Sequence, residues 1–190
     1  MNSVYILMDK SGSMSSKVVN AVKSINDYLK ELPEDTNVYF TSFDSNSYDV
    51  VRSTTIKHYD TVMPVEINAR GGTPLYDSTA RLINKAISDA PDKAVFVIMT
   101  DGFENCSTDF TFEQIQKLLK SIQNERKWEV VFLGAEFTDV NSQAQGLGIK
   151  TGKMRNMDSD VMYAATSMDM TRETRSYFST GKEINLDENV

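Results

Sequence analysis

Three uninterrupted apolar runs constrain this chain more than any other feature of its sequence. They are Val4–Met8, Ala94–Met99 and Val130–Leu133. A strand with one face in water alternates apolar and polar residues, whereas a strand covered on both faces of a mainly parallel sheet is apolar throughout. The runs therefore predict three central strands of a largely parallel sheet with helices on both of its faces.

Helical patterns alternate with these runs along the chain. The first is an apolar stripe at steps of three and four that ends before Pro33, formed by Val18, Val22, Ile25, Leu29 and Leu32. Similar stripes lie between Pro74 and Pro91 and over 112–122. This alternation predicts an α/β fold, a three-layer α/β/α sandwich of the Rossmann-like kind.

Two further strands are expected over 38–43 and 48–56, joined by the turn-forming residues Asp44-Ser45-Asn46-Ser47. Four connecting residues are too few for a parallel crossover, so these strands should form an antiparallel hairpin.

The signals weaken after Leu133. We expect a short helix over 139–145, a short edge strand over 149–154, and a last helix over 160–180 that Gly181 ends. The partial apolar face of that last helix would be Val161, Ala164, Ala165, Met168 and Met170. Residues 182–190 are expected to form a polar, acidic and frayed tail, which leaves 1–181 as a single domain.

Composition narrows the classes of function. The chain has 190 residues, 40% of them hydrophobic, which suits one domain with a real core. A net charge of -7 argues against nucleic acid as a partner. No apolar stretch approaches the ~18 residues of a membrane helix, and no signal peptide is visible, so a cytoplasmic protein is expected. The single cysteine, Cys106, suits a reducing cytosol. The oligomeric state stays open.

Oxygen-bearing residues follow the buried runs. Asp9, Asp101 and Glu136 come at or just after the ends of the three runs, and ligands of such sheets bind outside the carboxyl ends of the strands. In Asp9-Lys10-Ser11-Gly12-Ser13, oxygens at alternate positions of a tight loop can point at a common centre. Thr73, in the flexible loop Arg70-Gly71-Gly72-Thr73-Pro74, could complete the group.

The resulting ligand set consists of oxygen alone: Asp9, Ser11, Ser13, Thr73 and Asp101. Hard divalent cations prefer such a set, which predicts a site for Mg²⁺ or Mn²⁺. Each part has a plainer interpretation when taken singly. Thr73 followed by Pro74 could simply start a helix, and Asp101-Gly102 could simply form a turn.

These motifs resemble the metal-ion-dependent adhesion site of von Willebrand factor A domains. The similarity rests on Asp9-x-Ser11-x-Ser13, on Thr73 in Gly-Gly-Thr-Pro, and on Thr100-Asp101-Gly102. It extends over nearly the whole chain, through the Trp128–Ala135 segment and the final helix, and is strongest to small single-domain bacterial and phage members.

The resemblance implies a six-stranded sheet with a short antiparallel strand at one edge and a metal at its top. Ser11 and Ser13 would bind the ion directly, whereas Thr73, Asp9 and Asp101 would bind it directly or through water. An Asp or Glu of a protein partner would fill the remaining position. Lys10, at a variable position of the motif, is expected to face solvent.

Two other classes of function stay open. In a structural reading, as in a virion or scaffold component, the ion would only brace the loops. In an enzymatic reading, the chain would be a magnesium-dependent phosphatase or nuclease. Phosphatases of the haloacid dehalogenase type need a carboxylate two residues after the nucleophilic aspartate, where this chain has Ser11, and two-metal nucleases need more clustered carboxylates. We therefore expect no catalytic residues.

Other chemically capable side chains carry weaker signals. His58 is the only histidine, so a zinc site built on a histidine pair is excluded, and a surface or strand position is expected. Asp44, Glu104 and Asp109 are interpreted as solvated loop charges, with Glu104 the best candidate for an acid in the outer shell of the metal.

Overall fold

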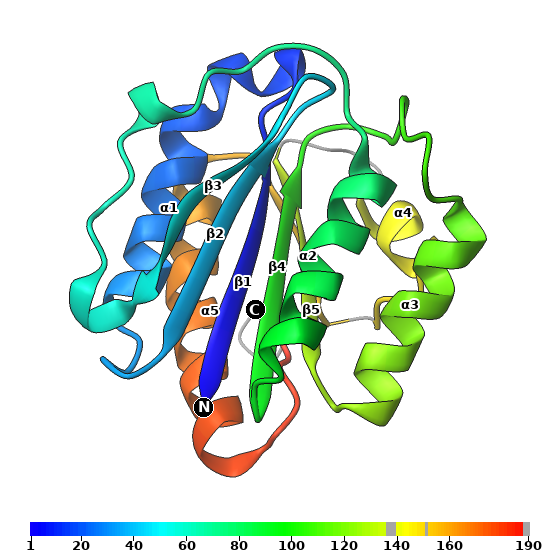
Figure 1. Cartoon of the computed structure of the whole chain (residues 1–190). Helices are drawn as coiled ribbons and strands as arrows, with labels where there is room; N and C mark the ends of the chain where they lie inside the picture. The colour runs from blue at the N-terminus through cyan, green and yellow to red at the C-terminus, as the bar shows by residue number, and fades with distance from the viewer. Residues whose placement is uncertain (136–139, 151, 188–190) are drawn as a thin grey trace.

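The computed structural model describes residues 1–135, 140–150 and 152–187. Its strands form one sheet in the order β3-β2-β1-β4-β5-β6 (Figure 1). The strands are β1 Asn2–Asp9, β2 Asn37–Phe43, β3 Tyr48–Thr55, β4 Lys93–Thr100, β5 Glu129–Ala135 and β6 Met154–Met157. Only the β2–β3 pair is antiparallel. The prediction of a mostly parallel six-stranded sheet with one antiparallel edge strand is confirmed.

Helices cover both faces of this sheet, which gives the predicted three layers (Figure 1). The helices are α1 Val18–Lys30, α2 Leu75–Asp89, α3 Phe112–Glu125, α4 Val140–Gly146 and α5 Asp160–Thr180. Helices α1 and α5 pack on one face, and α2, α3 and α4 on the other. Short 3₁₀ turns occupy Gly12–Ser16, Ile56–His58 and Pro64–Glu66. No helix within the described ranges is long and apolar enough to cross a bilayer.

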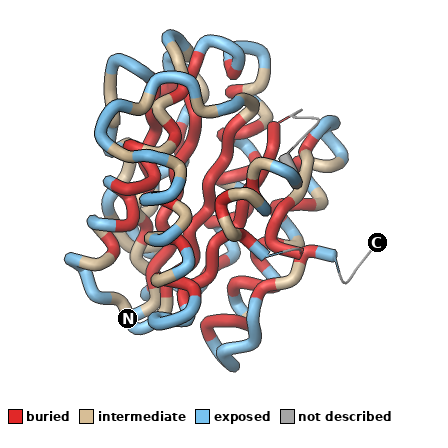
Figure 2. Tube along the Cα trace, turned by 90° about the vertical axis from the view of Figure 1, so that its right-hand side faces the viewer, coloured by how far each residue is buried: buried red, intermediate tan, exposed pale blue. Residues whose placement is uncertain are grey.

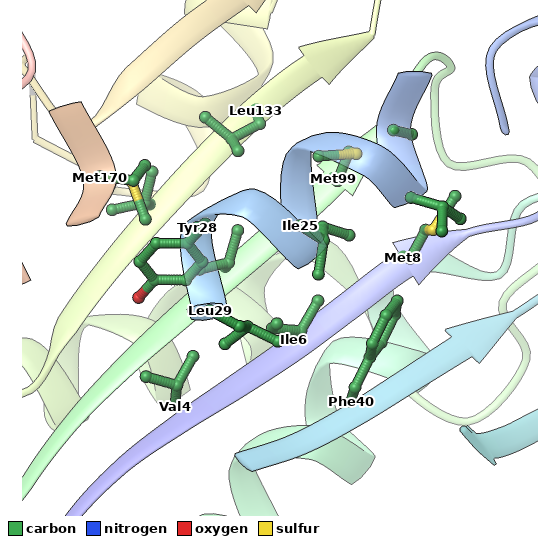
Figure 3. Packing of buried hydrophobic residues seen from close by; sticks show 14 of the residues in the cluster. Val4, Ile6, Met8, Ile25, Tyr28, Leu29, Phe40, Met99, Leu133 and Met170 are labelled. Atoms are coloured by element: carbon green, nitrogen blue, oxygen red, sulfur yellow. The ribbon is translucent and has the colours of Figure 1, made fainter. Parts of the chain in front are cut away.

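The two helical layers explain why the central strands are apolar throughout. In β1, Val4, Ile6 and Met8 pack with α1 and α5, whereas Tyr5 and Leu7 pack with α2 and α3. Figure 2 shows the buried strands as a continuous interior beneath partly exposed helices, and Figure 3 shows the contacts on the α1 side. Both faces of each central strand therefore bury apolar surface, and each Å² of apolar surface removed from water stabilises the fold by about 25 cal/mol.

The hairpin and the short helix after β5 agree with expectation. Strands β2 and β3 pair from Phe43 and Tyr48 to Asn37 and Thr55, with a register shift between Phe40 and Thr41. Helix α4 covers positions 140–145 of the range predicted as helical and extends it to Gly146; position 139 lies outside the described residues, as does Glu136.

The predicted edge strand over 149–154 is wrong in position, because β6 is Met154–Met157. Ile149 is buried, and its amide donates to the carbonyl of Ala144 at the end of α4. A turn closed by the Lys153 amide and the Lys150 carbonyl follows, with Gly152 at φ +85°. Ile149 is apolar because it packs beneath the end of α4, and not because it belongs to a strand.

The bounds of α5 are as predicted. The side chain of Ser159 accepts from the Met162 amide at its start, and Gly181 ends it at φ +77°. The predicted apolar face is confirmed only at Met170, which is buried, and is wrong at Val161 and Met168, which are 76% and 73% exposed. The buried residues include Tyr163, Thr166, Met170, Thr171, Thr174 and Tyr177. Thr171 and Thr174 can be buried here because their hydroxyls have partners: Thr171 Oγ1 donates to the Tyr28 carbonyl (3.1 Å), and Thr174 Oγ1 lies 3.0 Å from the Tyr28 hydroxyl.

The segment after α5 is docked, so the prediction of a frayed tail is wrong for 182–187. Ile184 and Leu186 are 2% and 0% exposed and belong to the core on the α1 side. The Ile184 amide donates to Glu129 Oε2 (3.2 Å), and that carboxylate lies 2.5 Å from Lys153 Nζ. The prediction relied on the mostly polar composition of the segment and overlooked the alternate apolar residues Ile184 and Leu186. Residues 188–190 lie outside the described part of the chain.

Candidate metal centre

The sequence motifs come together at one end of the two central strands. Asp9 is the last residue of β1, and Asp101 follows Thr100, the last residue of the neighbouring strand β4. Because these strands are parallel, their carboxyl ends meet at the same edge of the sheet, the upper edge in Figure 1.

Asp9 is completely buried and held from both sides. Its Oδ1 accepts from the Ser11 amide (2.6 Å), and its Oδ2 accepts from Thr100 Oγ1 (2.5 Å). Burial raises the pKa of Asp9 to about 6, against the lowering effect of these hydrogen bonds. The negative charge of Asp101 adds slightly to the rise, because a nearby like charge disfavours ionisation.

Ser13 connects the first loop to the second carboxylate. Its hydroxyl donates to Asp101 Oδ1 (2.7 Å) and lies 3.2 Å from the Ser11 hydroxyl. The structure therefore brings Asp9, Ser11, Ser13 and Asp101 into one connected group. The other oxygen of Asp101, Oδ2, lies 2.8 Å from Lys17 Nζ.

Thr73 borders this group from a third loop. The Gly12 amide donates to the Gly71 carbonyl (3.1 Å), which joins that loop to the Asp9–Ser13 loop. The φ of Gly71 is +68°, a conformation that glycine adopts without strain. A Cβ added at Gly102 would lie 3.9 Å from Thr73 Oγ1, so the hydroxyl lies beside the Asp101-Gly102 turn.

Thr73 does not cap a helix. Helix α2 begins at Leu75, its N-cap residue is Pro74, and the amides of Tyr76 and Asp77 in its first turn donate to Glu104 and Ser107 and not to Thr73. The Thr73 amide instead donates to Asn105 Oδ1 (2.9 Å), which fixes the loop against the segment after β4. The plainer interpretation of Thr73 as a helix cap is therefore wrong.

The donor set fits a hard divalent cation. Two neighbouring carboxylates, one of them fully buried, require positive charge, and three hydroxyls stand beside them. No group of three or more His, Cys, Asp or Glu side chains suited to a metal occurs among the described residues. Hydroxyl oxygens would therefore have to complete the ligand set, which favours Mg²⁺ or Mn²⁺. His58 is an exposed surface residue, as expected.

The prediction that Lys10 faces solvent is wrong. Its side chain is only 5% exposed, and Nζ lies 2.5 Å from Asp49 Oδ2 and 2.8 Å from Ser47 Oγ. The ammonium therefore points to the β2–β3 turn, where acceptors replace the water it loses.

Asp44 is also not a solvated charge, because its side chain is 0% exposed. Burial by itself would raise the pKa of Asp44, but hydrogen bonds from the Asn46 and Ser47 amides and from Arg70 outweigh it. Together with the positive charge of Lys10, they hold the pKa below its ordinary value of 3.8. Asp44 thus organises the turn that receives Lys10.

Glu104 has a structural role in the loop after β4. Its carboxylate accepts from the amides of Cys106 and Ser107 and from the Tyr76 amide in the first turn of α2. These bonds close the loop and satisfy the start of the helix, which leaves no support for Glu104 as an outer-shell acid. Asp109 is exposed, as predicted.

Sequence reasoning missed Asp77, a buried acid on α2. Its carboxylate accepts from three consecutive amides, those of Thr108, Asp109 and Phe110 (2.9, 3.1 and 2.9 Å). An aspartate in the first turn of a helix is common, so no pattern marked it. Through these bonds α2 positions the loop that begins at Asp101.

The model of the von Willebrand factor type A domain matches residues 3–175. The chain belongs to the von Willebrand factor type A family. This assignment agrees with the resemblance seen in the three motifs and with the strand order of the sheet. No curated protein sequence is similar enough to this type A domain to count as a relative.

Solved structures share the fold of this type A domain at low sequence identity. The vWF domain of the type V pili tip protein Mfa5 from Porphyromonas gingivalis has a TM-score of 0.75 and 10% identity, covering 95% of this chain and 97% of that one. A von Willebrand factor type A protein from Catenulispora acidiphila has a TM-score of 0.70 and 16% identity, covering 92% and 43%.

Proximal thread matrix protein 1 from the mussel byssus, solved with a zinc-occupied MIDAS motif, has a TM-score of 0.64 and 13% identity. The match covers 92% of this chain and 48% of that protein. This type A domain therefore spans less than half of the Catenulispora and mussel chains, and the likeness concerns the fold.

Proposed function

We propose that this domain binds a divalent cation, Mg²⁺ or Mn²⁺, through Asp9, Ser11, Ser13, Thr73 and Asp101, and presents it to an acidic side chain of a protein partner. The observation that carries the proposal is the link through Ser13, whose hydroxyl lies 2.7 Å from Asp101 Oδ1 and 3.2 Å from Ser11 Oγ. This link brings the first and the last motif into one group.

The charges explain why such a site would accept one more anion. Asp9 and Asp101 together neutralise a dication, and the hydroxyls of Ser11, Ser13 and Thr73 add no charge. The bound ion therefore keeps enough Lewis acidity for another oxygen ligand, and a carboxylate is the strongest such ligand that a protein supplies.

Comparisons with known proteins support a binding role. Type A domains are mostly interaction modules and often hold a divalent metal at this motif. One structural neighbour carries zinc in its MIDAS motif, and another is a pilus tip protein. We propose binding without catalysis here, because the position two residues after Asp9 holds Ser11 in place of a second carboxylate.

We propose that the domain is cytoplasmic. Cys106, the single cysteine of the chain, is exposed and unpaired. Oxidising compartments favour disulfides over exposed free thiols.

Calorimetric titration of the metal-free protein with Mg²⁺ and Mn²⁺ tests the metal site. Asp101→Asn should abolish binding because a charged ligand is lost. Asp109→Asn removes the same charge from an exposed position of the following loop and should leave binding unchanged. Equal affinity of the wild type and Asp101→Asn would contradict the assignment of Asp101.

Affinity purification from a lysate of the native host tests the partner. A protein retained in Mg²⁺ by the wild type and by Asp109→Asn, but lost in EDTA and with Asp101→Asn, is expected. Replacing single Asp and Glu residues of that protein with Asn and Gln should identify one acid on which retention depends. Metal binding without any metal-dependent partner would favour the structural role, in which the ion only braces the loops.

A further inference from the structure

Lys17 engages the second carboxylate of the candidate metal centre. It follows the Gly12–Ser16 turn and immediately precedes α1, and its Nζ lies 2.8 Å from Asp101 Oδ2. The side chains of Lys17 and Asp101 are 15% and 1% exposed, so water screens this ion pair poorly. The same ammonium donates to the Ser13 carbonyl (3.3 Å), inside the first motif.

This contact changes the charge balance of the site. Asp9 and Asp101 carry two negative charges, and Lys17 places one positive charge on the carboxylate of Asp101, at Oδ2, while Ser13 faces Oδ1. An ammonium and a dication repel each other strongly at such a distance in partly buried surroundings. An ammonium at Asp101 Oδ2 therefore opposes the binding of a dication to the same carboxylate.

We infer that Lys17 is a tethered counter-ion of Asp101 that competes with the divalent cation for the negative charge of this carboxylate and so lowers the affinity of the site for metal. This inference rests on the proposed metal site. It adds that the charge of Lys17 helps to set the affinity of that site for a divalent cation. Without metal, Lys17 stabilises a carboxylate that would otherwise be buried beside Asp9 with little compensation.

Lys10, another lysine close to this site, is not a counter-ion of Asp101. Lys10 lies in the Asp9–Ser13 loop, but its ammonium is held by Asp49 and Ser47 on the side of the β2–β3 turn. Removing the charge of Lys10 would leave both oxygens of Asp101 with their present partners.

The test compares Lys17→Gln and Lys17→Arg with a matched control, Lys23→Gln. Lys23 lies on α1, its side chain is 70% exposed, and it pairs at the surface with Asp27, so its replacement changes the net charge equally. Calorimetry should show Lys17→Gln binding Mg²⁺ roughly tenfold more tightly than the wild type, because a repelling charge has gone. Lys17→Arg and Lys23→Gln should bind like the wild type.

Thermal melting provides a readout that does not depend on metal affinity. In EDTA, Lys17→Gln should melt below Lys23→Gln, because Asp101 loses its counter-ion. In saturating Mg²⁺ the two variants should melt alike, because the dication replaces that charge.

Two results would overturn the inference, and they can be told apart. If the wild type binds Mg²⁺ and Lys17→Gln binds it with equal or lower affinity, Lys17 does not compete, and the metal site itself stands. If neither the wild type nor any of the variants binds Mg²⁺ or Mn²⁺, the proposed function fails and the inference fails with it.

Discussion

The ammonium of Lys10 lies 2.5 Å from Oδ2 of Asp49, a pairing that fastens the first loop of the candidate metal centre to the β2–β3 turn. The backbone repeats this connection, because the Lys10 amide donates to the Phe43 carbonyl and its carbonyl accepts from the Arg70 amide. The loop that carries Ser11 and Ser13 is therefore held from both sides, which leaves its hydroxyls in place before any ion binds.

Lys10→Met should destabilise the fold by about 1–2 kcal/mol, less than the ~3–5 kcal/mol for breaking a fully buried ion pair. The loss is moderate because Asp49 is half exposed and can be hydrated, and because Asp44 keeps Arg70. Urea unfolding measures the change. Lys57→Met, at an exposed position, should change the free energy of unfolding by less than about 0.5 kcal/mol. Equal losses in the two variants would contradict the role of Lys10.

Asp44 should make stability depend on pH in the acid range. The pKa of Asp44 is lower in the folded protein than its ordinary value of 3.8. The ionised carboxylate therefore stabilises the fold fully when the pH is above that ordinary value. That contribution is lost as the pH falls through the lowered pKa. Asp44→Asn should therefore be less stable than the wild type at pH 7, with the difference shrinking as the pH falls below about 4. Unfolding curves at both pH values test this; a constant difference would show that ionisation is irrelevant.

Asp77→Ala should loosen the loop that begins at Asp101. Three partly buried amides would lose their acceptor, and each such loss costs about 1–3 kcal/mol before relaxation or hydration, so a net loss of about 2–4 kcal/mol is expected. Hydrogen exchange should become faster at the amides of Thr108, Asp109 and Phe110. Asp35→Ala, at an exposed position, serves as the control. Unchanged exchange rates at those amides would contradict the role of Asp77 as their acceptor.

Leu186→Ala should show that the segment after α5 is part of the core. Leu186 is fully buried, and truncation of a buried leucine costs about 2–5 kcal/mol. Val65→Ala, at a residue 88% exposed, should have almost no effect. Chemical unfolding of both variants checks the prediction. A Leu186→Ala protein as stable as the wild type would mean that the segment is not docked in solution.

Much of the fold could be predicted because it depends on local pattern. The apolar run Val4–Met8 indicates a strand covered on both faces, and four residues between β2 and β3 permit only an antiparallel pair. The pattern failed where burial did not follow hydrophobicity. Thr174 on α5 is buried through a hydrogen bond with Tyr28, which no periodicity in either helix could indicate.

The sequence by itself determined the layers of the sheet and which oxygens stand at the ends of β1 and β4, because alternation, turn length and the position after a buried strand are properties of the local chain. Only the tertiary structure decided how the charges around those oxygens are paired. Lys10 and Lys17 lie in or beside the same loop, yet one pairs with Asp49 and the other with Asp101. These partners are distant in sequence, and they become neighbours only when the strands are packed side by side.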